Sequence, residues 1–265
     1  MACRESSLDF LRELGYTPIQ LPREHIYPLD LVGKRPGAGA ARHLGPLPRL
    51  MRTADAPPPM RQDELVGQIT GRRTDKLDVG LGLHLLGKLL AALGALAISA
   101  KVGFERARQV EFSYEDVRSD SVDIIELREY LGRRPALDAG NPVIDDYFIG
   151  EGQVVVITRT LKSRSFGVTA TDEQGQEIEV DVNVLQRNLA EVGVDVSAAT
   201  RTKVSFRGPR PLVFAFQGLA LHIDTGGLQV ADDVPPEFGT LAARPAVPGE
   251  AVPVVLGRYG LLKLE

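Results

Sequence analysis

The fold class is decided by residues 151–182, whose sequence is EGQVVVITRTLKSRSFGVTATDEQGQEIEVDV. Residues 151–171 contain no proline and are rich in β-branched side chains, which is typical of a long strand. The following Asp172-Glu173-Gln174-Gly175 is favourable for a turn, and residues 177–182 then alternate between acidic and apolar side chains. This pattern predicts a β-hairpin.

Further strands and helices are predicted on both sides of this hairpin. Alternation of apolar and polar residues predicts a strand over 101–117, and two shorter strands are predicted over 202–206 and 212–221. Helical spacing of apolar residues predicts helices over 6–14, 121–131 and 185–192. Because strands and helices are mixed without regular βαβ alternation, we expect an α+β fold with a mainly antiparallel sheet.

The remaining N-terminal half is predicted to be less regular. Prolines at 18, 22 and 28 give residues 16–32 an extended, edge-strand character, and residues 33–59 are interpreted as a long loop. Residues 79–100 are long and apolar enough to cross a bilayer as a helix. Lys88 at the middle and several glycines argue against a permanent membrane span, so we expect a buried core helix.

Composition narrows the class of protein. The chain has 265 residues, 43% of them hydrophobic, and a formal net charge of −4 at pH 7, which argues against a general nucleic-acid binder. Cys3 is the single cysteine, so an intrachain disulfide is excluded, and the polar N-terminus does not resemble a signal peptide. The intact protein is therefore expected to be cytoplasmic.

The C-terminal residues differ in composition from the rest of the chain. We interpret residues 1–234 as one folded domain, 235–253 as a proline-rich linker, and 254–265 as an apolar peptide. The peptide is too short to fold alone and too apolar to remain in water, so it must dock on another surface. Its apolar cluster begins at Val254 and includes Val255, Leu256, Tyr259, Leu261, Leu262 and Leu264.

The sequence lacks the usual motifs of enzymes and metalloproteins. The four histidines are scattered without metal-ligand spacing, and no phosphate-binding loop is present, so no metal and no bound cofactor are predicted. Cys3 is interpreted in three ways: as an unremarkable cysteine, as a nucleophile with no evident base, or as a site for reversible acylation beside an amphipathic helix.

Several stretches together resemble the bacterial gasdermins over most of the chain. Their order and spacing carry the resemblance: Leu14-Gly15-Tyr16, Leu21-Pro22, Ile26-Tyr27-Pro28-Leu29-Asp30, residues 69–77 (ITGRRTDKL) leading into 79–100, residues 112–117 (FSYEDV) and residues 154–161 (VVVITRTL). The resemblance implies a twisted, mainly antiparallel sheet with surrounding helices, and a protein that forms pores and is not an enzyme.

The resemblance also implies a mechanism. About residues 65–114 and 152–184 would refold into membrane-spanning hairpins of a homo-oligomeric β-barrel pore, whereas the intact chain would be a monomer. Residues 254–265 would be an inhibitory tail, removed by an unidentified protease that cuts near Leu241, Ala242, Ala243 and Arg244. Cys3 would carry a palmitoyl group. The cut protein would move to the inner membrane and kill the cell, in defence against phage.

The hairpin supplies the candidate membrane residues. We expect Val154, Val156, Ile178, Val180 and Val182 to contribute to its apolar side, and Glu177, Glu179 and Asp181 to line the pore. Two groups of basic residues are candidates for contact with anionic lipid headgroups. They are Lys101, Arg106 and Arg108, and Arg159, Lys162 and Arg164. The alternative function is an acylated lipid-binding or interaction protein that forms no pore.

Overall fold

The structure is a computed structural model of the chain. It describes residues 11, 14–36, 38, 40–52, 55–66, 75–78, 109–133, 136–138, 140–149, 152–172, 174, 176–179, 186, 194–198, 200, 202–224 and 227–230. The predicted helices over 6–14, 79–100 and 185–192 fall almost entirely outside these residues, as do Cys3, residues 241–244 and the tail 254–265. None of the described helices is long and apolar enough to cross a membrane.

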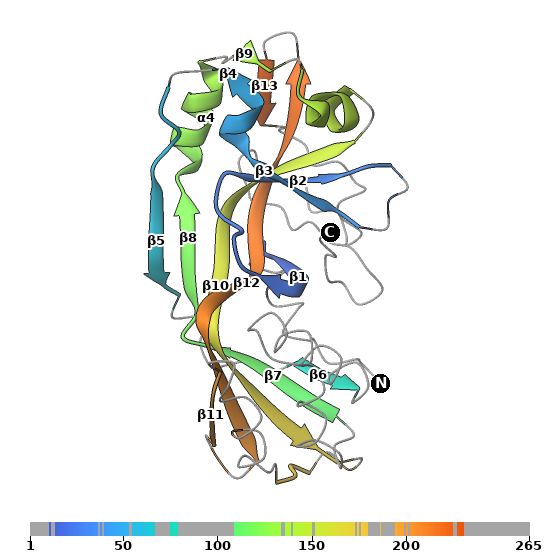
Figure 1. Ribbon diagram of the computed structural model, residues 1–265, viewed down its shortest axis with the longest axis vertical. Coiled ribbons are helices and arrows are strands. Elements are labelled where there is room, and N and C mark those ends of the chain that lie inside the picture. The colour runs from blue at the N-terminus through green and yellow to red at the C-terminus, as the bar shows by residue number, and fades with distance from the viewer. Residues whose placement is uncertain are drawn as a thin grey trace.

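Two long antiparallel strands run the length of the molecule (Figure 1). They are β10 (Gln153–Thr171) and β12 (Lys203–Asp224), and they pair from Val154↔Leu221 to Thr169↔Lys203. The single strand β10 confirms the strand predicted over 151–171. In contrast, the two strands predicted over 202–206 and 212–221 are one strand, β12, because the intervening residues continue along β10 with a change of register.

The upper part of the sheet is built on these two strands and forms the body of the molecule. Next to β12 lies β1 (Thr17–Arg23), and next to β10 lie β2 (Asp30–Lys34) and then β3 (Arg42–Pro46). β1 is at the end of the strand order, which confirms the expected edge position and explains why its prolines are tolerated. β2 lies inside the sheet, and β3 corrects the loop predicted over 33–59.

Additional elements extend the body. β8 (Arg118–Val122) pairs with β10, β5 (Met60–Leu65) pairs with β8, and β13 (Gly227–Val230) pairs with β12. β4 (Met51–Arg52) and β9 (Ala136–Leu137) form a small separate sheet, and η1 (Leu47–Leu50) and η2 (Ile144–Ile149) are short helices. The predicted helix over 121–131 is α4 (Ile124–Gly132), which begins later because residues 121 and 122 belong to β8.

The core of the body lies on both faces of β10. Val154 and Val156 belong to one buried cluster with Leu127 and Leu219, and Val155 and Ile157 belong to a second cluster on the opposite face. A strand covered on both faces is expected to be continuously apolar, which explains the unbroken run at 154–157. Across the described residues, the antiparallel sheet dominates and helices are few.

Candidate functional site

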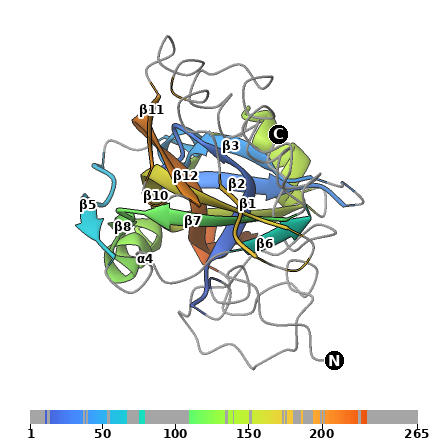
Figure 2. The ribbon, with the colours of Figure 1, turned by 90° about the horizontal axis from the view of Figure 1, so that it is seen from below.

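Below the body, β10 and β12 continue into a second, smaller group of strands. This group, called the lower sheet, contains residues 165–171 of β10, residues 203–207 of β12, β6 (Asp75–Asp78), β7 (Gln109–Glu115) and β11 (Asp195–Ala198). β7 pairs with β10 and β11 pairs with β12. Figure 1 shows β10 and β12 bending away from the body at this level, and Figure 2 shows the same strands from below.

The lower sheet is separated from the body by an interruption of the strand pairing. Ser163 pairs with Leu212, but Ser165 pairs with Arg207, so residues 208–211 lie between the two registers. At the same level β7 ends and β8 begins, and Asp116 between them has a positive φ of 48°. We call residues 116–117, 163–165 and 208–211 the hinge. Pro209 and Pro211 cannot donate a backbone hydrogen bond, which explains the interruption.

The hinge is stabilised locally by the Ser163 side chain. Its hydroxyl donates to the Glu115 carbonyl oxygen and accepts a hydrogen bond from the Ser165 amide at 2.9 Å. Ser163 is buried, so this hydroxyl provides partners for backbone groups where the regular ladder is broken. The hinge is therefore an ordered feature of the sheet.

One face of the lower sheet is apolar. Phe166, Val168 and Ala170 of β10 are buried, as are their neighbours Val204 and Phe206 on β12. The rings of Phe166 and Phe206 stack with centroids 5.1 Å apart. Because side chains alternate along a strand, residues between these positions lie on the opposite face.

The opposite face is polar and contains a charge pair that crosses β10. Lys203 Nζ of β12 lies 2.6 Å from Glu115 Oε1 of β7, and Ser205 donates to Glu115 Oε2 at 3.0 Å. Gly167 lies between them, and a Cβ there would be 2.3 Å from Lys203 Cε and 2.7 Å from Ser113 Oγ. Glycine therefore leaves room for the lysine to reach across, and the lower sheet is amphipathic.

The tip of β10 contains the predicted turn. Asp172 Oδ1 accepts hydrogen bonds from the amides of Gln174 at 2.9 Å and Gln176 at 2.8 Å. Thr171 and Glu177 form an isolated antiparallel bridge, so the chain does turn back at the predicted position. However, the long partner of β10 is β12, which pairs with it from residue 154 to residue 169. Residues 180–182 of the predicted hairpin strand lie outside the described residues.

The structure separates the residues predicted for the membrane hairpin. Val154 and Val156 are buried in the body at the start of β10, whereas Ile178 is half-buried just beyond the tip. Val180, Val182 and Asp181 lie outside the described residues, and Glu177 and Glu179 are exposed. Lys162, predicted to meet lipid headgroups, is instead enclosed by carboxylates, whereas Arg159 and Arg164 are exposed.

Neither the Glu115–Lys203 pair across β10 nor the hinge was predicted from the sequence. The pair forms only because β7 and β12 both become neighbours of β10, so the sequence around Glu115, Gly167 and Lys203 does not indicate it. The hinge is visible in the local sequence, since Gly-Pro-Arg-Pro at 208–211 separates two strand patterns. Those prolines indicated an interruption, but not that the strand continues past it.

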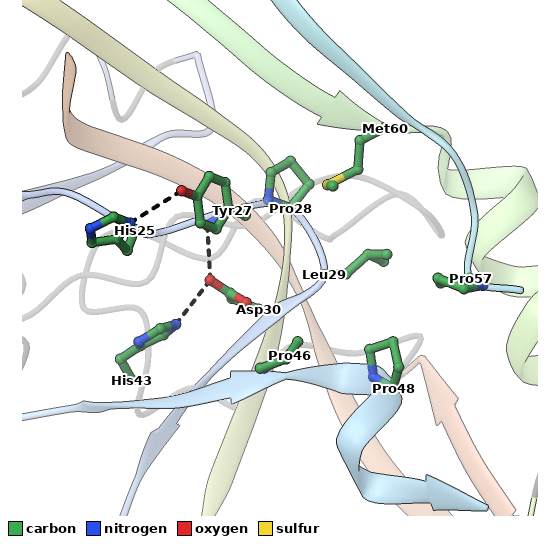
Figure 3. Close-up of a pocket in the computed structure, with 10 residues that line it drawn as sticks. All are labelled: His25, Tyr27, Pro28, Leu29, Asp30, His43, Pro46, Pro48, Pro57 and Met60. Carbon is green, nitrogen blue, oxygen red and sulfur yellow. Dashed lines mark hydrogen bonds and ion pairs between the residues drawn. The ribbon is translucent and has the colours of Figure 1, made fainter. Parts of the chain in front are cut away.

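A pocket of about 420 Å³ opens on the body between the β1–β2 connection, β3 and β5 (Figure 3). Its wall is mostly apolar, with prolines 28, 46, 48 and 57 beside Leu29 and Met60. The polar side has two contacts: His43 Nε2 lies 2.9 Å from Asp30 Oδ2, and His25 Nδ1 lies 3.3 Å from Tyr27 Oη. Such a pocket could hold an apolar group with a polar end.

The described residues contain no group of three or more His, Cys, Asp or Glu side chains that could hold a metal ion. The pocket has one His–Asp pair, in which Asp30 is buried and also accepts a hydrogen bond from the Tyr27 amide at 2.9 Å. This carboxylate shapes the β1–β2 connection, where His25 and Leu29 have positive φ values of 61° and 71°. Its contacts are those of a structural group.

The architecture is that of a gasdermin. A solved structure of a bacterial gasdermin from Bradyrhizobium tropiciagri superposes with a TM-score of 0.63. The match covers 83% of this chain and 89% of that chain at 16% sequence identity, so it establishes the shared fold.

Sequence similarity establishes the family. The model of the Bacterial Gasdermin Family matches residues 19–228. Gasdermin bGSDM of Vitiosangium sp. is 31% identical over 268 residues, covering 99% of this chain and 98% of the relative. Gasdermin bGSDM of a Desulfuromonadales bacterium is also 31% identical, with 85% of each chain covered. This chain belongs to the bacterial gasdermin family, which supports a pore-forming function.

Proposed function

We propose that this protein is an autoinhibited pore-former that is activated by proteolytic removal of its C-terminal tail. The observation that carries the proposal is the amphipathic lower sheet, with Phe166, Val168 and Phe206 on one face and the Glu115–Lys203 pair on the other. Family membership supports the same function. The protein therefore acts by forming a membrane pore and not by catalysis.

The bilayer requires the lower sheet to assemble with other copies. Unpaired backbone groups are costly in hydrocarbon, so strands can cross a membrane only in a closed barrel. A strand must also contain ~9 to 11 residues to span the bilayer, and the described lower part of β12 is shorter. Insertion therefore involves lengthening of the strands as well as oligomerisation.

The two faces of the lower sheet have different roles in this pore. The apolar residues Phe166, Val168 and Phe206 would face lipid, and Ser113, Glu115 and Lys203 would face the aqueous lumen. Glu177, Glu179 and Asp181 would extend the polar lining beyond the tip. Arg159 and Arg164 remain candidates for contact with anionic headgroups, because both are exposed.

The regulatory part of the proposal concerns residues outside the described ones. Residues 254–265 hold the protein inactive, and a protease cuts within 235–253, near residues 241–244. Palmitoylation of Cys3 increases membrane affinity by ~0.8 kcal/mol per buried methylene. The intact monomer resides in the cytoplasm, and the cut protein forms homo-oligomeric pores in the inner membrane that kill the cell during phage infection.

A site for a known protease inserted near Leu241 tests this function. Dye-loaded vesicles containing anionic lipid should remain tight with the intact protein and leak after cutting. The matched control carries the same insertion with the scissile residue replaced, so that the added protease cannot act. A chain truncated near residue 240 that stayed monomeric and left vesicles tight would show that the tail does not restrain a pore.

The alternative is an acylated protein that binds lipid or a partner without forming a pore. The specific observation in its favour is the apolar pocket beside Tyr27 and Met60, whose side chains are 44% and 41% exposed. Vesicle binding without dye release after cutting would favour this alternative. Intact-protein mass spectrometry would determine independently whether Cys3 is acylated.

A further inference from the structure

Lys162 is the centre of a charge cluster on the body side of the hinge. Its Nζ lies 2.8 Å from Asp120 Oδ1 on β8 and 2.8 Å from Asp63 Oδ1 on β5. The side chains of Lys162 and Asp120 are only 13% and 4% exposed, whereas that of Asp63 is 69% exposed. One ammonium group thus joins three strands, β10, β8 and β5.

The backbone of β5 is shaped to provide this contact. Arg61 pairs with Ser121 and Glu64 pairs with Ser119, so residues 62 and 63 together oppose Asp120, as in a β-bulge. Asp63 has a positive φ of 57°, and its amide donates to Asp120 Oδ1 at 2.9 Å. The left-handed conformation is uncommon for a residue other than glycine, so the position is held by its surroundings.

β5 has few other attachments to the body. Among the described strands it pairs with β8 alone, and all of its residues from Met60 to Leu65 are exposed. Burial of side chains therefore contributes little to holding this strand. Asp63 contacts Lys162 at 2.8 Å, which is the shortest of the side-chain contacts between β5 and the body. In the others, Ser121 donates to Glu64 at 3.3 Å, Arg118 donates to the Asp63 carbonyl oxygen at 3.4 Å, and Arg61 lies 3.9 Å from Asp123.

The directions of the pKa shifts of Asp63 and Lys162 agree with a favourable contact between these two side chains. The hydrogen bond from Lys162 lowers the pKa of Asp63 below its ordinary value. Burial alone would lower the pKa of Lys162, but its hydrogen bonds to Asp120 and Asp63 outweigh burial and raise it. A buried ammonium group is strongly destabilising when its partners are removed, so the two carboxylates are needed to keep Lys162 in this position.

The cluster lies where the sheet changes direction. The pairing of β8 with β10 ends at Lys162↔Arg118, and the register of β10 on β12 shifts between Leu161 and Lys162. Any movement of the lower sheet about the hinge must therefore pull on β8 and β5 next to these charges.

We propose that Lys162, Asp120 and Asp63 form a latch that holds β5 on the body and slows the conversion of the intact sheet into the pore. The effect on conversion rests on the proposed function, whereas the effect on β5 does not. Opening the latch separates β5 from β8 and frees the sheet beside the hinge. Lys162 is thus a positioning residue for pore formation.

Hydrogen exchange of the intact full-length chain measures the latch directly. In Asp63→Asn the neutral amide loses its ion pair with Lys162, so exchange of the 60–65 amides should rise about threefold. In Lys162→Met, which also leaves Asp120 buried without its cation, the rise should exceed tenfold. Amides of β2, which do not contact the latch, should be unchanged in Asp63→Asn.

Asp138→Asn is the matched control. Asp138 follows β9 and pairs with Arg52 at 2.6 Å, so it contacts neither β5 nor the hinge. Asp138→Asn removes the same charge from another ion pair of the body and should leave exchange of residues 60–65 unchanged. After cutting, Asp63→Asn should release vesicle dye faster than the wild type, whereas Asp138→Asn should match it.

Each result has a defined meaning. Equal β5 exchange in Asp63→Asn and Asp138→Asn overturns the latch, even if Lys162→Met is too unstable to study. If Asp63→Asn exchanges faster at β5 but releases dye at the same rate as a wild type that does leak, the latch has no role in pore formation. If the cut wild type releases no dye, the proposed function fails, and the exchange comparison still decides whether the latch holds β5.

Discussion

Phe206→Ala is expected to show how much burial of the apolar face of the lower sheet stabilises the intact chain. The Phe206 side chain is fully buried and stacks on Phe166. Loss of the buried ring costs about 2 kcal/mol in transfer free energy, and the cavity left in a paired sheet adds to this. We therefore expect the free energy of unfolding to fall by about 3 to 5 kcal/mol.

Urea denaturation followed by far-ultraviolet circular dichroism measures this loss in a chain that has no tryptophan. With a urea dependence of about 2 to 3 kcal/mol/M, the midpoint should fall by about 1 to 2.5 M. Ile125→Ala is the control, because Ile125 on α4 is 69% exposed and its truncation should cost less than about 0.5 kcal/mol. A loss below about 1.5 kcal/mol for Phe206→Ala would refute the conclusion that this face is closely packed in the intact chain.

Three further substitutions test the body of the protein. Gly218→Val should lower the unfolding free energy by about 1 to 3 kcal/mol, because a Cβ there would lie 2.3 Å from Val155 Cγ1; an unchanged melting temperature would contradict this. Asp123→Ala should cost about 1 kcal/mol in urea denaturation, because Asp123 caps α4 by accepting from the Ile125 amide at 2.8 Å; Asp123→Asn, which retains the cap, should cost less. The lowered pKa of Asp63 stabilises the fold above the ordinary value of 3.8, and this contribution is lost as pH falls through the folded-state pKa. Asp63→Asn should therefore weaken the acid dependence of the urea midpoint below about pH 4, and an unaltered dependence would contradict the Lys162 contact.

The sequence predicted those elements that are determined by residues close together in the chain. The β-branched run at 153–171 is β10, and Asp172 forms the expected turn with hydrogen bonds to the next amides. The helix predicted over 121–131 exists as α4, with Asp123 as its cap. In each case neighbouring residues contain the information, through side-chain shape, turn chemistry or helical spacing.

Pairing across the chain could not be predicted in the same way. Residues 177–182 alternate as a hairpin strand should, but over residues 165–169 the two edges of β10 are paired with β12 and β7. Lys162 illustrates the same limit, because its neighbours in sequence suggest an exposed basic group. Its carboxylate partners, Asp63 and Asp120, become neighbours only when β5, β8 and β10 assemble.

The prolines of β12 restrict the geometry of any barrel built from this chain. A proline nitrogen has no hydrogen to donate, so residues 209 and 211 would each leave a missing bond if the strand were drawn into the membrane. In the proposed pore, the hydrocarbon boundary would therefore fall on the tip side of Pro209. Residues 203–207 alone are too short to span the bilayer, so this strand would have to lengthen away from the hinge, toward β11, which pairs with β12 in the intact sheet.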